Sequence, residues 1–98
     1  MEYAKSYTLR YYGTIAIGPN AGKVLDGWTT EIFTTELAAL HKADVDVKQI
    51  KGRIEVYTRQ FFAKEPTDKP KGAQWQESKR GKKFGGMLYV PLKVLTSV

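Results

Sequence analysis

Basic and aromatic side chains occur together at three places in the chain. The groups are Tyr12 with Arg10, Tyr57 with Arg59, and Trp75 and Phe84 around a run of Lys and Arg. Cationic side chains contact phosphates, and flat aromatic faces stack on nucleobases, with each stacked base contributing about 1–3 kcal/mol. These residue types therefore indicate binding of a polyanion with accessible bases.

The excess positive charge lies in the second half of the chain. Residues 51–98 carry a net charge of +7, whereas residues 1–50 carry −1. We expect phosphate contacts from the densest cluster, which is Lys79, Arg80, Lys82 and Lys83, with support from Arg53, Arg59, Lys69 and Lys71. The residues expected to stack on bases are Trp75, Phe84, Tyr12 and Tyr57.

Residues that could perform catalysis or bind a metal are few. The chain has no cysteine and a single histidine, His41, so the usual zinc ligand sets cannot be assembled. Asp44 and Asp46 alternate with valines, and this pattern predicts a strand whose carboxylates face water. Lys23 follows a Gly-Pro-Asn-Ala-Gly turn that lacks the spacing and the Ser or Thr of a phosphate-binding loop. We therefore expect neither enzymatic activity nor a cofactor or metal.

Hydrophobic periodicity divides the chain into strands and one helix. Alternation over 3–17 predicts a strand, and the turn at 18–22 joins it to a second strand over 23–33 in a hairpin. The helix is predicted over 34–43, with Thr34 or Thr35 as its N-cap. The remaining predicted strands are 45–50 and 54–62, joined by a hairpin at Lys51-Gly52, and 87–95, in which Pro91 indicates a sheet edge or strand end.

The segment 64–86 has no strand or helix signal and contains most of the basic cluster. We predict that it is a long, mobile loop, because structureless connections of this length are usually functional or disordered. The predicted fold class is all-β or α+β, within a single domain over 1–98. It consists of a small antiparallel sheet or partly closed five-stranded barrel, one short helix, and the long basic loop before the last strand.

Together these patterns predict a non-enzymatic nucleic-acid-binding domain that prefers single strands and has little sequence specificity. The alternative is a small protein-interaction module, such as an inhibitor or assembly subunit, that docks its basic loop on an acidic protein. Self-association through the edge strand at Pro91 stays open. The first 13 residues lack a signal-peptide pattern and no apolar run has membrane-spanning length, so we expect a cytoplasmic protein without membrane contact.

Overall fold

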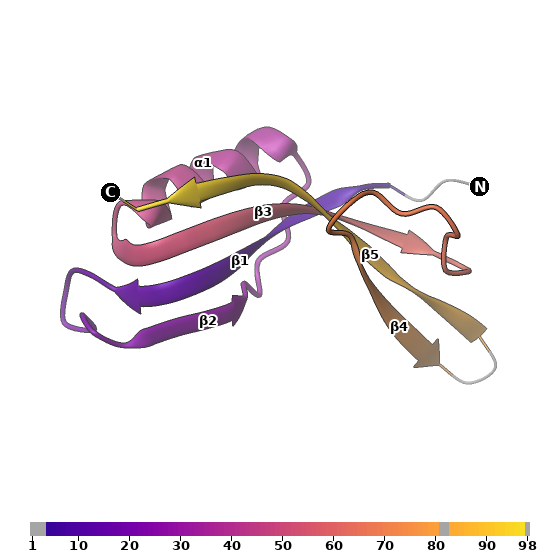
Figure 1. Cartoon of the computed structure of the whole chain (residues 1–98), viewed down its shortest axis with the longest axis horizontal. Coiled ribbons are helices and arrows are strands. Elements are labelled where there is room, and N and C mark those ends of the chain that lie inside the picture. The colour runs from indigo at the N-terminus through magenta and orange to yellow at the C-terminus, as the bar shows by residue number, and fades with distance from the viewer. Residues whose placement is uncertain (1–3, 81–82, 98) are drawn as a thin grey trace.

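The computed structural model describes residues 4–80 and 83–97, which form a curled five-stranded antiparallel sheet and one helix (Figure 1). In chain order the elements are β1 (Ser6–Ile15), β2 (Val24–Trp28), α1 (Glu36–Val47), β3 (Ile50–Phe62), β4 (Gln74–Arg80) and β5 (Lys83–Thr96). The strand order across the sheet is β2-β1-β3-β5-β4. The predicted small antiparallel sheet with one short helix is confirmed, and its curl makes it a half-barrel.

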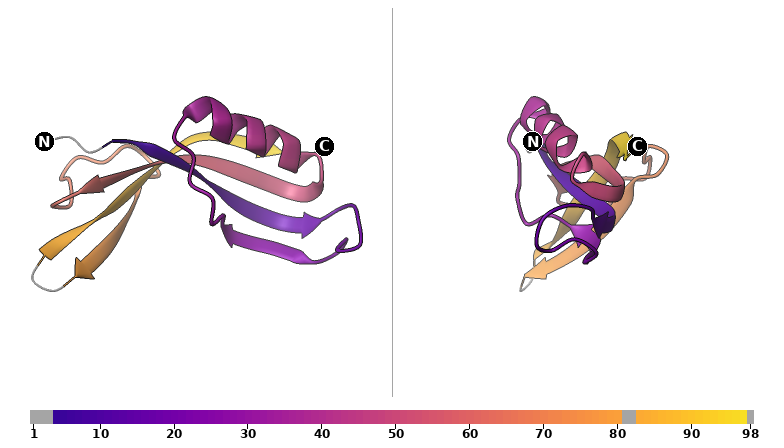
Figure 2. Two further views of the ribbon diagram at one scale, coloured as in Figure 1. Left: turned by 180° about the vertical axis from the view of Figure 1, so that it is seen from behind. Right: turned by 90° about the vertical axis from the view of Figure 1, so that its left-hand side faces the viewer.

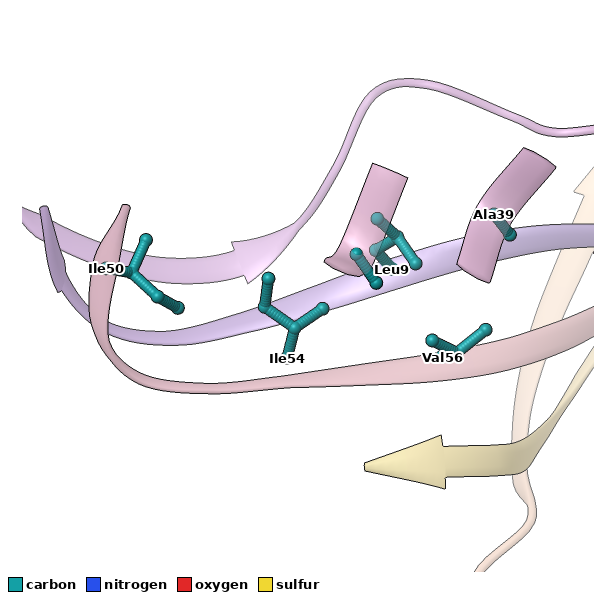
Figure 3. Packing of buried hydrophobic residues seen from close by; sticks show 6 residues of the cluster. Leu9, Ala39, Ile50, Ile54 and Val56 are labelled. Atoms are coloured by element: carbon teal, nitrogen blue, oxygen red, sulfur yellow. The ribbon is translucent and has the colours of Figure 1, made fainter. Parts of the chain in front are cut away.

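The core lies between α1 and one face of the sheet (Figure 3). Leu9, Ile54 and Val56 are fully buried on that face, where alternate positions of β1 and β3 point toward the helix. The helix presents Ala39 and Ala43, both fully buried, to these side chains. Small residues at this contact let the helix backbone lie close to the sheet.

The sheet extends well beyond the helix (Figures 1 and 2). β4 pairs with residues 83–89 of β5, and these two strands continue away from the helix-covered part together with the end of β3. We call β4 and residues 83–89 the arm. The arm gives the molecule its elongated dimensions of 46 × 26 × 22 Å.

The helix differs from its predicted boundaries. Thr35 is the N-cap, as one of the two predicted alternatives, and its Oγ1 accepts a 3.2 Å hydrogen bond from the Ala38 backbone N–H. The predicted strand over 45–50 and hairpin at Lys51-Gly52 are wrong, because α1 continues to Val47 and β3 begins at Ile50. Ala39, Ala43 and Val47 follow at four-residue intervals toward the core, so helical burial prevails over the local Asp-Val alternation.

The predicted 64–86 loop is also wrong over about half of its length. Residues 74–80 form β4 and residues 83–86 begin β5, so the connection between β3 and β4 covers only 63–73. β4 is a polar edge strand whose partner is supplied by β5, and backbone pairing leaves little trace in the side-chain pattern. The sequence signal was therefore weak here, because Trp75 is the only large apolar side chain of β4.

Close aromatic packing explains two glycines of this region. A Cβ atom on Gly85 would lie 2.6 Å from Cζ of Phe61, and one on Gly86 would lie 2.7 Å from Cζ2 of Trp75. Both distances are shorter than non-bonded carbon contacts allow. The two glycines thus make room for rings of the chain itself inside the arm.

The predicted edge position of Pro91 holds only locally, because β5 lies between β3 and β4 in the sheet and the edge strand on this side is β4. The pairing of β4 with β5 ends at Tyr89, so the following residues of β5 pair only with β3. A register shift opposite Val56 and Tyr57 leaves Leu92 as the extra residue of a bulge. The predicted second strand, in contrast, ends early at Trp28, and Val24 is 75% exposed while Leu25 packs against the core.

Candidate nucleic-acid interface

The face of the sheet opposite α1 carries the basic and aromatic side chains of three neighbouring strands. Arg10 and Tyr12 are on β1, where Arg10 pairs with Trp28 of the neighbouring strand β2. Tyr12 pairs with Arg53 of β3, the neighbour on the other side of β1. Leu9 and Ile54, which alternate with these residues, point to the helix side. We call this surface the helix-free face; it includes Arg10, Tyr12, Trp28, Arg53, Glu55, Tyr57, Arg59 and Tyr89.

Four side chains of the helix-free face form a row in which aromatic rings and guanidinium groups alternate. The Arg10 guanidinium carbon lies 5.2 Å from the ring centroid of Trp28 and 5.1 Å from that of Tyr12. The Arg53 guanidinium carbon lies 3.9 Å from the centroid of Tyr12. Guanidinium groups at these distances are attracted by the ring quadrupole. The row therefore runs Trp28, Arg10, Tyr12, Arg53.

Two carboxylates orient the guanidinium groups of the row. Arg53 Nε lies 3.5 Å from Oε2 of Glu55, and Arg10 Nη2 lies 4.0 Å from Oδ1 of Asp26. The Arg53 side chain is 47% exposed, whereas that of Arg10 is 27% exposed. Ion pairs this exposed are weak. Arg53 is therefore the guanidinium of the row that an anionic ligand reaches most readily.

Tyr57 is a supporting residue rather than a stacking surface, which corrects the sequence-based prediction. Tyr57 is only 4% exposed to solvent. The rings of Trp28 and Tyr57 pack edge-on, with their centroids 4.8 Å apart. Burial, followed by a 2.8 Å hydrogen bond that its hydroxyl donates to Oε1 of Glu55, raises the pKa of Tyr57 to about 12. Tyr57 thus holds Glu55 beside Arg53.

Arg59 lies on the helix-free face, farther along β3 toward the arm. Its Nη1 lies 3.4 Å from Oγ of Ser6, and the residue is half-buried. Lys69 and Lys71 are exposed in the 63–73 connection, where Lys69 pairs with Glu65. Of the predicted residues, Tyr12, Arg53 and Arg59 therefore share one face, while both lysines lie on a separate segment.

Trp75 does not belong to the helix-free face, contrary to its predicted role beside the other contact residues. It pairs with Leu88, so its side chain points to the opposite side of the sheet, where the ring lies against Gly86. The indole Nε1 is buried and has no hydrogen-bond partner among the described residues. Trp75 is a packing residue of the arm.

The remaining predicted contacts concentrate at the end of the arm. Lys79 and Arg80 are in β4, and Lys83 and Phe84 are in β5, where Arg80 pairs with Lys83. The positions of these four side chains, and all of Lys82, lie outside the described residues. The backbone pairing places Lys79, Arg80 and Lys83 at the far end of the arm.

Sequence reasoning identified the face of Arg10 and Tyr12 from their parity but missed Trp28 and Tyr89. The predicted strand over 23–33 assigned no contact role to Trp28, and Val24 and Ile32 of that segment are exposed. The ring of Trp28 lies over Tyr57 and Tyr89 on the helix-free face. The size of Trp28 could have indicated its role, because a large aromatic side chain on a short edge strand must pack against other side chains to be shielded from water.

Neither a metal centre nor a membrane-spanning helix is found in the parts of the chain that the structure describes. Over 4–80 and 83–97, no three His, Cys, Asp or Glu side chains come together where they could hold a metal ion. The described helix is too short and too polar to cross a membrane. Comparison with known protein families, curated proteins and solved structures yielded no match to this chain.

Proposed function

We propose that this protein is a non-enzymatic nucleic-acid-binding domain that prefers single strands and has little sequence specificity. The observation that carries the proposal is the row of Trp28, Arg10, Tyr12 and Arg53 on the helix-free face. Guanidinium groups beside aromatic rings supply both the phosphate contact and the stacking surface that a single strand needs. Contacts with the phosphates of the nucleic acid do not distinguish one base sequence from another.

The preference for single strands follows from what the helix offers. Reading a duplex in the major groove usually requires a helix that presents basic and polar side chains. From Glu36 to the C-cap Lys48 the helix carries two lysines against three carboxylates, Glu36, Asp44 and Asp46, so it has a net charge of −1 and no basic surface. The sheet face is the surface with accessible cations and rings.

The charge distribution supports a polyanionic ligand. Of the net +7 of residues 51–98, β3, the 63–73 connection and the arm carry +5, and Lys82 and Lys93 supply the rest. A single strand lying on the helix-free face and continuing along β3 would pass Arg53 and then Arg59. The cysteine-free composition suits the reducing cytoplasm, where we expect the protein to act.

The proposal is tested by titrating labelled single-stranded and duplex oligonucleotides at two salt concentrations. We expect tighter binding of the single strand and an affinity that falls as salt rises, because phosphate contacts release counterions. Failure to bind single strands at low salt, or an affinity that does not respond to salt, would contradict the proposal. Capture of an acidic protein that survives nuclease treatment would favour the protein-interaction alternative.

A pair of charge-matched variants locates the site. Arg53→Gln removes one cation from the helix-free face, and Lys48→Gln removes one from the C-terminal end of the helix, where the side chain is 74% exposed. Arg53→Gln should weaken binding and reduce the slope of log affinity against log salt by about 0.7, the value for one phosphate contact of a single strand. Lys48→Gln should leave both quantities near those of the native chain.

A further inference from the structure

A hollow on the helix-free face adjoins the end of the row. It has a volume of about 420 Å³ and is lined by Tyr12, Gly13, Gly52, Arg53, Thr96 and Ser97. We call it the Gly52 hollow. It lies where β1, β3 and the end of β5 run side by side, since Arg53 pairs with both Tyr12 and Thr96.

Two glycines opposite one another leave backbone, and no side chain, at the centre of this lining. Gly13 pairs with Gly52, and their φ angles are +132° and +151°. A Cβ atom on Gly13 would lie 2.1 Å from the Lys51 carbonyl oxygen, and one on Gly52 would lie 1.9 Å from that of Tyr12. No larger residue fits at either position, so the two strands meet backbone to backbone along this lining.

The wall formed by the end of β5 is held in place by reciprocal hydrogen bonds. The Gly52 N–H donates to Oγ of Ser97 at 2.8 Å, and the Ser97 N–H donates to the Gly52 carbonyl oxygen at 2.8 Å. These bonds fix Thr96 and Ser97 relative to β3. The hollow is thus built before any ligand binds, and a preformed site loses less entropy on binding.

A flat cationic group stands at the rim. The Arg53 guanidinium covers one side of the Tyr12 ring at 3.9 Å, while Glu55 holds its Nε from the side. Guanidinium planes stack on nucleobases as aromatic rings do. The chemistry at the rim therefore suits a planar, electron-rich group attached to an anionic chain.

We propose that the Gly52 hollow holds one nucleobase of a bound single strand, stacked on Arg53, with the adjacent phosphate beside the same guanidinium. The inference rests on the proposed function and adds to it the place where a base, rather than the phosphate chain, is recognised. Shape and stacking decide the contact, so all four bases fit and sequence preference stays low.

The test compares two ligands with equal numbers of phosphates: a short oligothymidine and an abasic chain of the same length. Thr96→Phe fills the hollow without changing charge, and its ring suits a strand position. Thr67→Phe, at an exposed position of the 63–73 connection, is the matched control. Affinities are measured by fluorescence anisotropy, after circular dichroism has shown that each variant is folded.

Thr96→Phe should weaken oligothymidine binding about tenfold, which corresponds to about 1.4 kcal/mol, and leave binding of the abasic chain unchanged. Thr67→Phe should affect neither ligand. Equal affinities of Thr96→Phe and the native chain for oligothymidine, or equal losses for both ligands, would overturn the inference alone. A native chain that binds no oligothymidine would overturn the proposed function and this inference with it.

A second variant keeps the inference falsifiable if Thr96→Phe does not fold. Arg53→Lys retains the charge and loses the planar group. It should weaken oligothymidine binding several-fold while the abasic chain binds as it does to the native protein. An equal effect on the two ligands would show that Arg53 acts on phosphate alone and would contradict base stacking in the hollow.

Discussion

The rings of Trp28 and Tyr89 lie with their centroids 4.8 Å apart, although their strands are separated by two others in the sheet. Trp28 is on β2 at the sheet edge, and Tyr89 is on β5. A flat sheet would hold these side chains far apart, since neighbouring strands are spaced about 4.8 Å. Their contact shows that the helix-free face is concave and that Trp28 reaches across it.

Trp28→Ala should therefore destabilise the fold. The substitution removes the ring contacts of Trp28 with both Tyr57 and Tyr89. We expect a loss of about 2–4 kcal/mol in the free energy of unfolding, measured by urea denaturation. The control is Trp75→Phe, whose buried indole N–H has no partner to lose and which should cost less. An equal cost for the two variants would argue against the closing role of Trp28.

On the helix side, the hydroxyl of Tyr11 donates a 2.6 Å hydrogen bond to Oδ2 of Asp46. Tyr11→Phe should reduce the free energy of unfolding by about 1–2 kcal/mol, because the bond joins β1 to the C-terminal turn of α1 and its acceptor is charged. A double-mutant cycle with Asp46→Asn measures the coupling. Additive effects of the two substitutions would show that the bond contributes nothing.

The raised pKa values of Tyr11 and Tyr57 predict how stability changes at alkaline pH. Burial, followed by the hydrogen bond and charge of Asp46, raises the pKa of Tyr11 well above its usual value, and the pKa of Tyr57 is raised to about 12. Groups whose pKa is higher in the folded state contribute fully below the unfolded value of about 10. Stability should fall as pH rises from about 10 through about 12, and Tyr11→Phe should make this fall shallower. A flat profile in urea denaturation over that window would contradict both assignments.

Substitutions of Gly27 and Gly52 separate the cost of backbone strain from the cost of a steric collision. Gly27→Ala places a side chain at φ +139° with nothing within 4 Å, so it should cost only the strain of that conformation, about 1–2 kcal/mol. Gly52→Ala adds a collision with the Tyr12 carbonyl and should cost more than twice as much or prevent folding. Thermal unfolding of the two variants checks this, and equal losses would be the contrary result.

Much of the fold could be predicted from local patterns, and the failures have a common cause. The alternation of Leu9 and Tyr11 with Arg10 and Tyr12 separated the two faces of β1 correctly, because period-two burial is written into the strand itself. The end of α1 was predicted wrongly because Asp46 and the valines beside it alternate as residues of a strand do. The hydrogen bond from Tyr11 to the Asp46 carboxylate, which joins this turn of the helix to β1, comes from a residue far away in the sequence.

The site was predictable only in part for the same reason. Arg53, Arg59 and Tyr12 meet because β1 pairs with β3, which strand parity anticipates. Trp28 joins them because the whole sheet curls, and no window of sequence contains that information. Trp75 was taken for a ligand contact because β4 was read as loop, whereas its ring fits against Gly86 within a hairpin.

Trp28 also provides the most direct test of the proposed interface. Trp75→Phe leaves Trp28 as the sole tryptophan of the chain, and its ring lies next to Arg10 in the row. Titration with oligothymidine should change the emission of Trp28, with a midpoint equal to the dissociation constant obtained by anisotropy of the labelled oligonucleotide. Binding that leaves Trp28 emission unchanged would place the nucleic acid elsewhere on the protein and contradict the assignment of the helix-free face.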